Sequence, residues 1–508
     1  MPPGRATMSP PPKWIYDVSM AGDCGVRLGG VALRKRVLIC FLVALAVILL
    51  SLGAGCGDGE EKAQGGGGEA HTLINKAGAE YPPGFTFVEV PDPLCGDNPV
   101  YPEPEMPMPG TGVAFEDACF STLLTKVTEA DGINGRHEYS RFDPFNADGS
   151  MILLVDEDGD YAVYRTDLMP YNQPGNLVRR TSELQEPRWD RGDPELLWGL
   201  SGFQIVRDDV VTGEREVVKD FSNDPAIAPI LAAEPDLYRV TMRDEGEASY
   251  DRRYWALILQ GSEEDYRPRY ILCWDRERDE VLGLYEVQPG ESDIDWVGMS
   301  PLGSWVLIGG MDGNSGNIVG LTMADRRLRE FHRIDYTTSH ADVGLDVNGS
   351  EVVVMQNSQT DFVDMLPLSP DTEPILEAGG SYEGTNRIPL LRLFYDSESP
   401  MGLSSGVHIS CNADGYCLVS THIEPGVPER NWLDRTNVLV RLDPDEPRAF
   451  YLSKTYNTTA AYWEETHGAL SNDGSRMVWA CNWNRDPGTE EVFLLQLDMP
   501  RDWRELTE

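Results

Sequence analysis

The feature that most constrains the fold is a short unit that recurs along the chain. Each copy is a short strand, a tight turn containing Asp-Gly or Asn-Gly, and a second, apolar strand. The clearest copies are residues 145–154, 345–354, 410–419 and 470–479, and weaker copies are residues 186–198, 248–257 and 299–308. Asp-Gly and Asn-Gly tolerate the positive φ angles that tight hairpins need, so each copy predicts a β-hairpin.

The spacing of the turns predicts the architecture. The turns fall at Gly149, Gly192, Arg252, Gly303, Gly349, Gly415 and Gly474, which are 43 to 66 residues apart. A second hairpin with an alternating strand, such as residues 161–166, follows most turns. Four short strands per unit without a long helical period predict an all-β fold, a seven-bladed β-propeller of four-stranded antiparallel blades. The last unit supplies three strands, so we expect residues 121–128 to complete that blade and close the ring.

The turn sequences also resemble a known family. The Ser-x-Asp-Gly-Ser turns are similar to the repeat of TolB-like (PD40, WD40-like) propellers, and residues 467–484 match that pattern best. The resemblance covers residues 115–508. It implies a propeller that presents one face to a protein partner, as TolB-like propellers do.

The N-terminal residues carry an export signal. Arg34-Lys35-Arg36 precede an apolar run from Val37 to Leu52, and Gly53-Ala54-Gly55-Cys56 follow it. This order resembles the signal sequence and lipobox of bacterial lipoproteins, with Cys56 as the lipidated residue, although Gly53 stands where the lipobox usually has an aliphatic residue. The alternative is an uncleaved membrane anchor, since the run is close to spanning length. Both interpretations place the remaining chain outside the cytoplasm, in the cell envelope and attached to a membrane.

Composition divides the chain after the signal. Residues 1–55 are the predicted signal sequence, residues 56–81 a flexible linker with four consecutive glycines at 65–68, and residues 82–114 a proline-rich extended segment. The propeller is expected over residues 115–508, and we expect it to be a monomer.

Charge excludes one class of partner. The chain has 84 acidic against 42 basic residues, a formal net charge of -42. Nucleic-acid affinity comes from cations that neutralise phosphates, so this composition excludes a nucleic-acid-binding protein. The acidity also suits a protein that is simply kept well hydrated.

The cysteines fit an oxidising compartment. Cys411 and Cys417 flank the turn at residues 412–416, close enough for a cross-strand disulfide, and Cys95 and Cys119 are a second candidate pair. Cys273 and Cys481 lie in apolar runs and are expected to be buried thiols. No Cys-x-x-Cys pair occurs, which gives no support to zinc-ribbon or thioredoxin chemistry.

Histidines recur in the register of the repeat. His408 and His467 each lie seven residues before the turn glycine of their unit. His340 lies nine residues before Gly349, with Asp342 at seven, and His422 follows the second strand of the sixth unit. In a propeller these positions meet at one mouth of the channel, so we expect the four imidazoles to converge there.

Two roles are open for this histidine group. Neutral imidazoles with Asp342 suit a divalent metal ion such as Mn, Zn or Fe, although nothing in the sequence requires a cofactor. The alternative is that the histidines hydrogen-bond neighbouring loops. The same rim collects candidate ligand-binding side chains that suit a sugar or a carboxylated ligand but equally suit loop packing, namely Gln356, Asn357, Arg430, Trp432, Trp483 and Arg485.

The motifs leave two functions open. We favour a binding module for an envelope protein, a glycan or a peptide. The alternative is a metal-dependent polysaccharide lyase, because the chain resembles the oligogalacturonate lyases, which are seven-bladed propellers of this repeat type with a histidine-rich metal site. The residues that carry this resemblance are His340, His408, His422 and His467. The chain lacks the Gln-x-x-His-x-His cluster of those lyases. Its strong negative charge also disfavours a polyuronate ligand.

Overall fold

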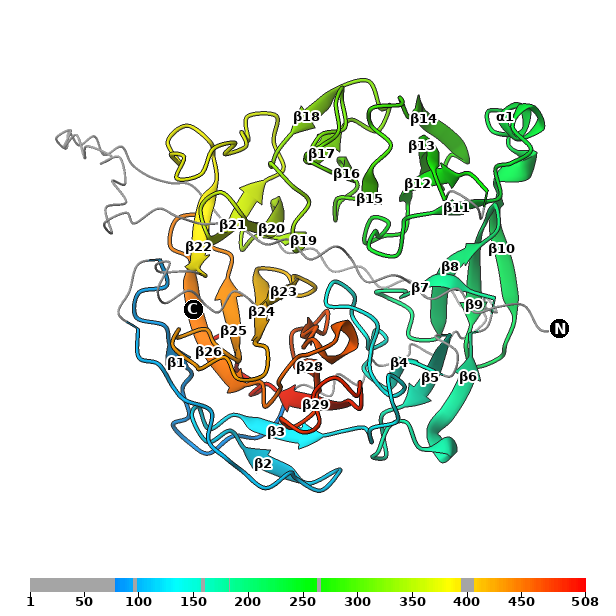
Figure 1. Ribbon diagram of the computed structural model, residues 1–508. Coiled ribbons are helices and arrows are strands. Elements are labelled where there is room, and N and C mark those ends of the chain that lie inside the picture. The colour runs from blue at the N-terminus through cyan, green and yellow to red at the C-terminus, as the bar shows by residue number, and fades with distance from the viewer. Residues whose placement is uncertain (1–77, 95–97, 157–159, 182, 263–265, 394–405) are drawn as a thin grey trace, which may run out of the picture. The chain divides into compact units, whose positions relative to one another are not determined.

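The computed structural model describes residues 78–94, 98–156, 160–181, 183–262, 266–393 and 406–508. Seven antiparallel sheets follow one another around a common axis in chain order, which is the predicted seven-bladed β-propeller (Figure 1). The described residues contain one α-helix, α1 (Ala228–Ala233), and the short 3-10 helices η2 (Pro174–Asn176), η3 (Phe221–Asn223) and η4 (Tyr462–Glu464). The predicted signal sequence, Cys56 and the glycine run lie outside the described residues.

The strands divide into blades in the order in which they occur. Blade 1 contains β4 (Met151–Val155), β5 (Tyr161–Arg165) and β6 (Leu177–Arg180), and blade 2 contains β7 (Gln185–Trp189), β8 (Leu196–Ser201), β9 (Gln204–Asp209) and β10 (Arg215–Asp220). Blade 3 contains β11 (Arg239–Thr241), β12 (Tyr254–Gln260), β13 (Pro268–Asp275) and β14 (Glu280–Glu286). Blade 4 contains β15 (Ile294–Met299), β16 (Val306–Gly310), β17 (Leu321–Ala324) and β18 (Phe331–Arg333). Blade 5 contains β19 (Ala341–Leu345), β20 (Glu351–Asn357), β21 (Phe362–Pro367) and β22 (Ile388–Arg392). Blade 6 contains β23 (Gly406–Ser410), β24 (Tyr416–His422), β25 (Thr436–Arg441) and β26 (Arg448–Lys454). Blade 7 contains β27 (Ala469–Leu470), β28 (Arg476–Cys481), β29 (Phe493–Asp498) and β3 (Leu123–Lys126). In blade 1 the innermost strand is reduced to a bridge between Phe145 and Ile152.

The repeated turns adopt the backbone conformation that their sequences favour. Gly149, Gly349, Gly415 and Gly474 have φ angles between 66° and 83°, in the left-handed region that glycine enters without steric penalty. In the weaker copy of blade 3, Arg252 stands at this position with a φ of 55°. These turns therefore bend as the repeat predicts, even where glycine is replaced, whereas Gly192 in the divergent copy of blade 2 does not adopt a positive φ.

A segment from before the first blade completes the last one. β3 pairs antiparallel with β29, with Leu124 opposite Leu497, and is the outer strand of blade 7. The outer edge of β3 is covered in turn by β2 (Ala114–Glu116). Strands from the two ends of the propeller domain thus share one sheet, which joins the first and last units.

The proline-rich segment lies along the outside of blades 6 and 7. Its short strand β1 (Val88–Glu89) pairs with β26 as a fifth strand of blade 6. Phe87 and Val90 are buried and pack into the apolar clusters of these blades. Trp483 of blade 7 donates a hydrogen bond from Nε1 to the Met106 carbonyl oxygen, 2.9 Å away. The described residues of this segment therefore bury their apolar side chains against the blades that they cover.

Apolar side chains are buried between adjacent blades. One cluster joins blades 3 and 4 through residues such as Ile258 and Val306, and another joins blades 7 and 1 through Val478 and Ile152. Seven such clusters occur in the described residues, one at each contact between adjacent blades. Each blade is therefore stabilised by burial on both of its faces.

The channel along the axis contains residues 136–143, which we call the channel segment. It precedes blade 1 and reaches the inner elements of the other blades. At one end Arg136 donates a hydrogen bond to the Trp463 carbonyl oxygen at 2.5 Å, and at the other the Asp143 carboxylate accepts one from the Asn472 amide at 2.7 Å. In between, the Arg141 guanidinium contacts Glu245 of blade 3 at 3.0 Å and lies 4.6 Å from the Trp296 ring of blade 4.

No helix within the described ranges has both the length and the apolar content needed to cross a membrane. The apolar run at residues 37–52, on which the anchor prediction rests, lies outside those ranges.

Closure of the ring can be tested at Leu124, whose side chain is fully buried between blades. We expect Leu124→Ala to lower the free energy of unfolding by ~2–5 kcal/mol, as for other buried leucines. The matched control is Leu123→Ala on the same strand, where the side chain is only partly buried and the expected loss is smaller. Chemical denaturation measures both, and equal losses for the two variants would contradict this packing of β3.

Candidate functional site

The structure brings the four predicted histidines together where blades 5, 6 and 7 meet the channel segment. His340 immediately precedes β19, His408 lies in β23, His422 ends β24, and His467 precedes β27. The His408 ring centroid lies 4.1 Å from that of His467, 5.0 Å from that of His340 and 5.5 Å from that of His422. Three consecutive blades therefore contribute to one group of imidazoles centred on His408.

A carboxylate that the sequence pattern did not indicate completes this group. Glu465 Oε2 lies 2.8 Å from His408 Nε2 and 3.7 Å from His467 Nε2, and Oε1 lies 3.9 Å from His422 Nε2. The Glu465 side chain is 22% exposed, whereas those of His408 and His467 are fully buried. Glu465 is thus more open to solvent than the imidazoles that it contacts.

The repeat register contains a signal for Glu465. It lies nine residues before Gly474, the place that His340 occupies relative to Gly349. The histidine pattern alone does not reveal this equivalence, so the carboxylate of blade 7 was missed from the sequence.

Two glycines allow the close approach of the elements that carry the site. A Cβ atom on Gly406 would lie 2.7 Å from Cε1 of the His422 ring, and one on Gly468 would lie 2.8 Å from Cβ of Ser420. Both distances are shorter than van der Waals contact allows. Glycine at these positions lets the His422 ring lie against β23 and lets the loop before β27 approach blade 6.

Burial keeps the imidazoles neutral. Loss of hydration lowers the pKa of His422 to about 4 and holds the pKa values of His408 and His467 well below their ordinary value. Nearby positive charge on Arg136 acts in the same direction on the pKa values of His408 and His467. At neutral pH these rings can therefore accept a proton or bind a cation through nitrogen.

The channel segment adds two side chains that sequence reasoning missed. His137 Nε2 lies 2.5 Å from the carbonyl oxygen of His467. The Tyr139 ring contacts the rings of His408 and His467 edge-on, with centroids 5.6 and 5.0 Å away. His137 lies twelve residues before Gly149, outside the register of the other histidines, so the repeat carries no signal for it.

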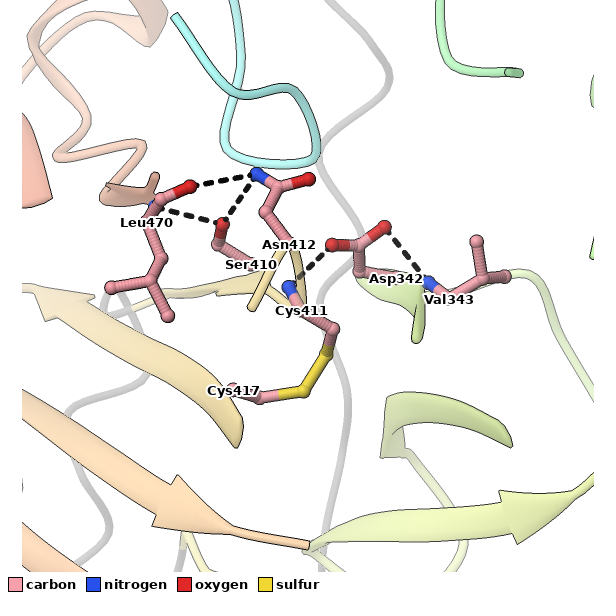
Figure 2. Close-up of a disulfide and its surroundings, with 7 residues drawn as sticks. All are labelled: Asp342, Val343, Ser410, Cys411, Asn412, Cys417 and Leu470. Atoms are coloured by element: carbon pink, nitrogen blue, oxygen red, sulfur yellow. Dashed lines mark hydrogen bonds between the residues drawn. A yellow bond between two sulfur atoms is a disulfide. The ribbon is translucent and has the colours of Figure 1, made fainter. Parts of the chain in front are cut away.

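Asp342 does not join the histidines, contrary to expectation. Its carboxylate accepts hydrogen bonds from the amides of Val343, at 2.8 Å, and Cys411, at 2.6 Å (Figure 2). Burial raises its pKa to about 7. Asp342 therefore links blade 5 to blade 6 rather than supplying a ligand.

The cysteines predicted to pair across the turn of blade 6 form a disulfide. Cys411 directly follows β23, which carries His408, and its sulfur is bonded to that of Cys417 in β24 (Figure 2). Next to Cys411, Asn412 donates a hydrogen bond to the Leu470 carbonyl oxygen at 3.0 Å, and Ser410 Oγ accepts one from the Leu470 amide at 3.0 Å. Since Cys411 also donates to Asp342, the disulfide loop contacts both neighbouring blades.

The other cysteine predictions are only partly tested. Cys95 lies outside the described residues, so its pairing with Cys119 stays a prediction. Cys119 has no disulfide partner within the described part of the chain, and Cys273 and Cys481 are buried thiols.

Two of the predicted ligand-binding aromatic residues are core residues. Trp432 is 2% exposed and packs against Tyr451, and Trp483 is 7% exposed and stacks on Tyr456 at 4.6 Å. Their ring faces are covered by other side chains, so neither offers a platform at the mouth. Packing against other side chains is the alternative role that the sequence left open for these two residues.

The predicted polar rim residues divide into structural and exposed ones. Asn357 is fully buried and donates a hydrogen bond to Asp364 at 2.8 Å. The backbone amide of Gln356 donates to the His340 carbonyl oxygen at 2.9 Å, which ties β20 to the start of β19. Arg430 and Arg485 are exposed.

The arrangement of donors suits a metal ion. One ring nitrogen each of His408 and His422 and a carboxylate oxygen of Glu465 all lie within 4.8 Å of one another. A tetrahedral zinc ion with bonds of ~2.0–2.1 Å separates its ligand atoms by roughly 3.3 Å. The distance of 2.8 Å between His408 and Glu465 is shorter than this and the distance of 3.9 Å between His422 and Glu465 is longer, so side-chain adjustments would bring all three into its shell. His467 is adjacent, and neither of its ring nitrogens has a hydrogen-bond partner among the described residues.

Comparisons with known proteins show no family for this chain. The sequence matches no protein-family model and no curated protein sequence. An oligogalacturonate lyase from Vibrio parahaemolyticus has a similar structure, with 12% identity, a TM-score of 0.47, and coverage of 77% of this chain and 97% of the lyase. A chain of the mitotic checkpoint complex is also similar, with 12% identity, a TM-score of 0.37, and coverage of 72% of this chain and 92% of the other. Likeness at this level carries no argument about fold or function, and the propeller architecture rests on the sheets themselves.

The buried carboxyl group of Asp143, at one end of the channel segment, should make the stability of the protein depend on pH. Burial raises the pKa of Asp143 to about 8, although backbone amides of Phe145 and Asn472 donate to it. A raised pKa means that the folded state binds the proton more tightly than the unfolded state, whose value is about 3.9. The stabilisation is therefore complete below about pH 4 and is lost as the pH rises to about 8.

We expect the Asp143→Asn variant to lack this contribution. The free energy of unfolding of the wild-type protein minus that of Asp143→Asn should fall between pH 4 and pH 8. The fall should be at least ~1 kcal/mol, since one pKa unit corresponds to about 1.4 kcal/mol. Urea denaturation of both proteins across this range measures the difference. A difference that is flat or rises with pH would show that Asp143 is ionised in the folded protein.

Proposed function

We propose that this protein is a lipid-anchored binding module of the bacterial cell envelope whose ligand binds at a divalent metal ion in the mouth of the propeller. The metal ligands are His408, His422 and Glu465. The observation that carries the proposal is the convergence of their nitrogen and oxygen atoms within 4.8 Å of one another.

The protonation of the site supports a metal ion. Metal ligands must be deprotonated, and burial already keeps the imidazoles of His408 and His422 neutral at pH 7. The short contact between His408 Nε2 and Glu465 indicates that Nε2 carries the proton in the metal-free protein. A cation at Nε2 would require that proton to move to Nδ1, so binding at neutral pH should release no net proton from His408, and it should weaken in acid as the imidazoles become protonated. Two imidazoles with one carboxylate suit Zn, Mn or Fe(II).

The exposure of Glu465 defines the side from which a ligand arrives. Its carboxylate is partly exposed while the imidazole of His408 is enclosed, so the open side of the site lies over Glu465. A metal ion held there would supply a Lewis acid that binds an oxygen atom of the ligand.

The disulfide supports the extracytoplasmic location. Structural disulfides form and persist in oxidising compartments, and Cys411–Cys417 lies next to the strands that carry the site. Together with the lipobox-like residues 53–56, it favours a protein that is exported and held at a membrane.

Metal binding is the direct test. We expect the protein purified without chelator, and then stripped and titrated with Zn²⁺ or Co²⁺, to bind one ion per chain. Either His408→Ala or Glu465→Gln should weaken binding more than ~100-fold, because loss of a ligand exceeds the 10–100-fold typical of an outer-shell change. Isothermal titration calorimetry with metal analysis of dialysed samples measures both quantities.

The matched control is His332→Ala. His332 lies in β18, where its ring is 6.4 Å from the Trp305 ring, and it is not one of the four histidines at the mouth. This variant should bind the ion as the wild-type protein does. Absence of stoichiometric binding by the wild-type protein would refute the proposal.

A second candidate function is a polysaccharide lyase, and the unpartnered imidazole of His467 favours it. A lyase needs a base that removes the proton next to a uronate carboxylate while the glycosidic oxygen leaves from the neighbouring carbon. Within the described residues, neither ring nitrogen of His467 has a hydrogen-bond partner, and its neutral imidazole lies 3.7 Å from Glu465. The net charge of -42 argues against a polyanionic substrate.

The lyase is tested by incubating the metal-loaded protein with oligogalacturonate. Elimination creates a carbon–carbon double bond conjugated to the carboxylate, which is followed by ultraviolet absorbance. We expect His467→Ala to abolish any such signal, and a silent wild-type protein that still binds the metal would leave the binding module as the function.

A further inference from the structure

The histidine group contacts the channel segment, residues 136–143. This segment contributes none of the proposed metal ligands, yet its side chains are the ones that contact His467, His408 and His340 from inside the channel. It is therefore placed to control where those rings lie.

The first contact is between two histidines. His137 is 1% exposed, and burial lowers its pKa to about 3, so it is neutral and carries one ring proton. Its Nε2 lies 2.5 Å from the carbonyl oxygen of His467, which can only accept, so the proton is on Nε2. The hydrogen bond thus holds the backbone of His467.

That backbone needs to be held. His467 has a φ of 43°, in the left-handed region that a residue with a Cβ atom enters at an energetic cost. Residues in such conformations persist only when their surroundings fix them. The bond from His137 fixes His467 from the channel side, and the Gly468 amide, which donates to Ser420 Oγ at 3.0 Å, fixes the following residue from blade 6.

The second contact is the ring of Tyr139. It lies edge-on against the rings of His408 and His467, and its hydroxyl group lies 3.5 Å from His340 Nδ1. Burial holds the pKa of the phenol well above its ordinary value, so the hydroxyl group remains a donor. One side chain thus restricts three of the four predicted imidazoles.

We infer that His137 and Tyr139 are positioning residues of the metal site and that the site is incomplete without the channel segment. Tyr139 contacts the proposed ligand His408 directly, and His137 acts through His467, whose ring stacks on that of His408 at 4.1 Å. The inference rests on the proposed metal site. A metal ion is bound tightly only where its ligands are already oriented, and loss of the groups that orient them typically lowers affinity 10–100-fold.

The anchoring of the segment explains how it can act in this way. Glu138 accepts a hydrogen bond from Arg188 of blade 2 at 2.9 Å, and Arg141 forms an ion pair with Glu245 of blade 3 at 3.0 Å. The Arg188 guanidinium lies over the Phe142 ring, with its central carbon 3.3 Å from the ring centroid. Blades 2 and 3, which supply none of the histidines, thus hold the segment that orients them.

The test compares His137→Leu with His137→Gln in the full chain. Leucine removes the donor, whereas the glutamine Nε2 group can donate at a similar reach to the His467 carbonyl oxygen. We expect Co²⁺ affinity to fall 10–100-fold in His137→Leu, with a changed visible spectrum of the bound ion, and to be largely restored in His137→Gln. A general loss of folding would lower the thermal midpoint of both variants, so the midpoints are measured alongside.

A metal-free readout separates this inference from the proposed function. Diethyl pyrocarbonate modifies accessible neutral imidazoles, and mass spectrometry identifies the modified residue. His467 should be protected in the wild-type protein and in His137→Gln, and should react at least several-fold faster in His137→Leu. If the wild-type protein binds no Co²⁺, the proposed function fails, while this labelling still decides whether His137 holds His467.

Tyr139 provides an independent variant if His137→Leu does not fold. Tyr139→Leu should weaken Co²⁺ binding, whereas Tyr139→Phe keeps the ring contacts to His408 and His467 and should retain most of the affinity. The inference for His137 is overturned if His137→Leu changes neither the Co²⁺ affinity nor the labelling of His467. The inference for Tyr139 is overturned if Tyr139→Leu leaves the Co²⁺ affinity unchanged.

Discussion

Each blade of this propeller buries its faces only against its neighbours, so the stability of any one sheet depends on the ring being closed. The seven apolar clusters between blades show this dependence, since each contains side chains from two adjacent sheets. The cluster between blades 7 and 1 has Val127 beside Phe145 and Val478, so the residues that close the ring are also core residues. Burial of apolar area at every interface, rather than the order within a single blade, is what holds the inner strands around one axis.

Placing seven inner strands around an axis leaves a channel, and the polar channel segment occupies it. A buried ion is costly unless it is paired, and Arg141 and Arg188 pair here with Glu245 and Glu138. Such contacts are directional, so they fix the segment in one position more narrowly than apolar packing alone would. A rigid segment at the centre is what allows blades 2 and 3 to influence histidines carried by blades 5 to 7.

The proposed metal site follows from the same geometry. The start of each inner strand lies near the axis, so side chains there approach those of adjacent blades. Burial then removes the proton that would otherwise compete for the imidazole nitrogens, while Glu465 stays partly exposed and provides negative charge to balance a cation. Rings stacked as closely as His408 and His467, at 4.1 Å, are compatible with each other because both are neutral.

The sequence by itself determined the number of blades, the register of their turns and the convergence of His340, His408, His422 and His467, because turn chemistry and strand alternation are local and the repeat transmits them around the ring. The tertiary structure alone decided which other groups join them. Glu465 had a register signal that is meaningful only once its neighbours are known, and His137 and Tyr139 lie in an irregular segment whose path no repeat describes. Asp342 shares the register of His408 but bonds to the Cys411 amide, and Trp432 and Trp483 pack into the core. Side-chain direction and the route of non-repeating segments depend on contacts between residues far apart in the chain, and these contacts exist only after the ring has formed.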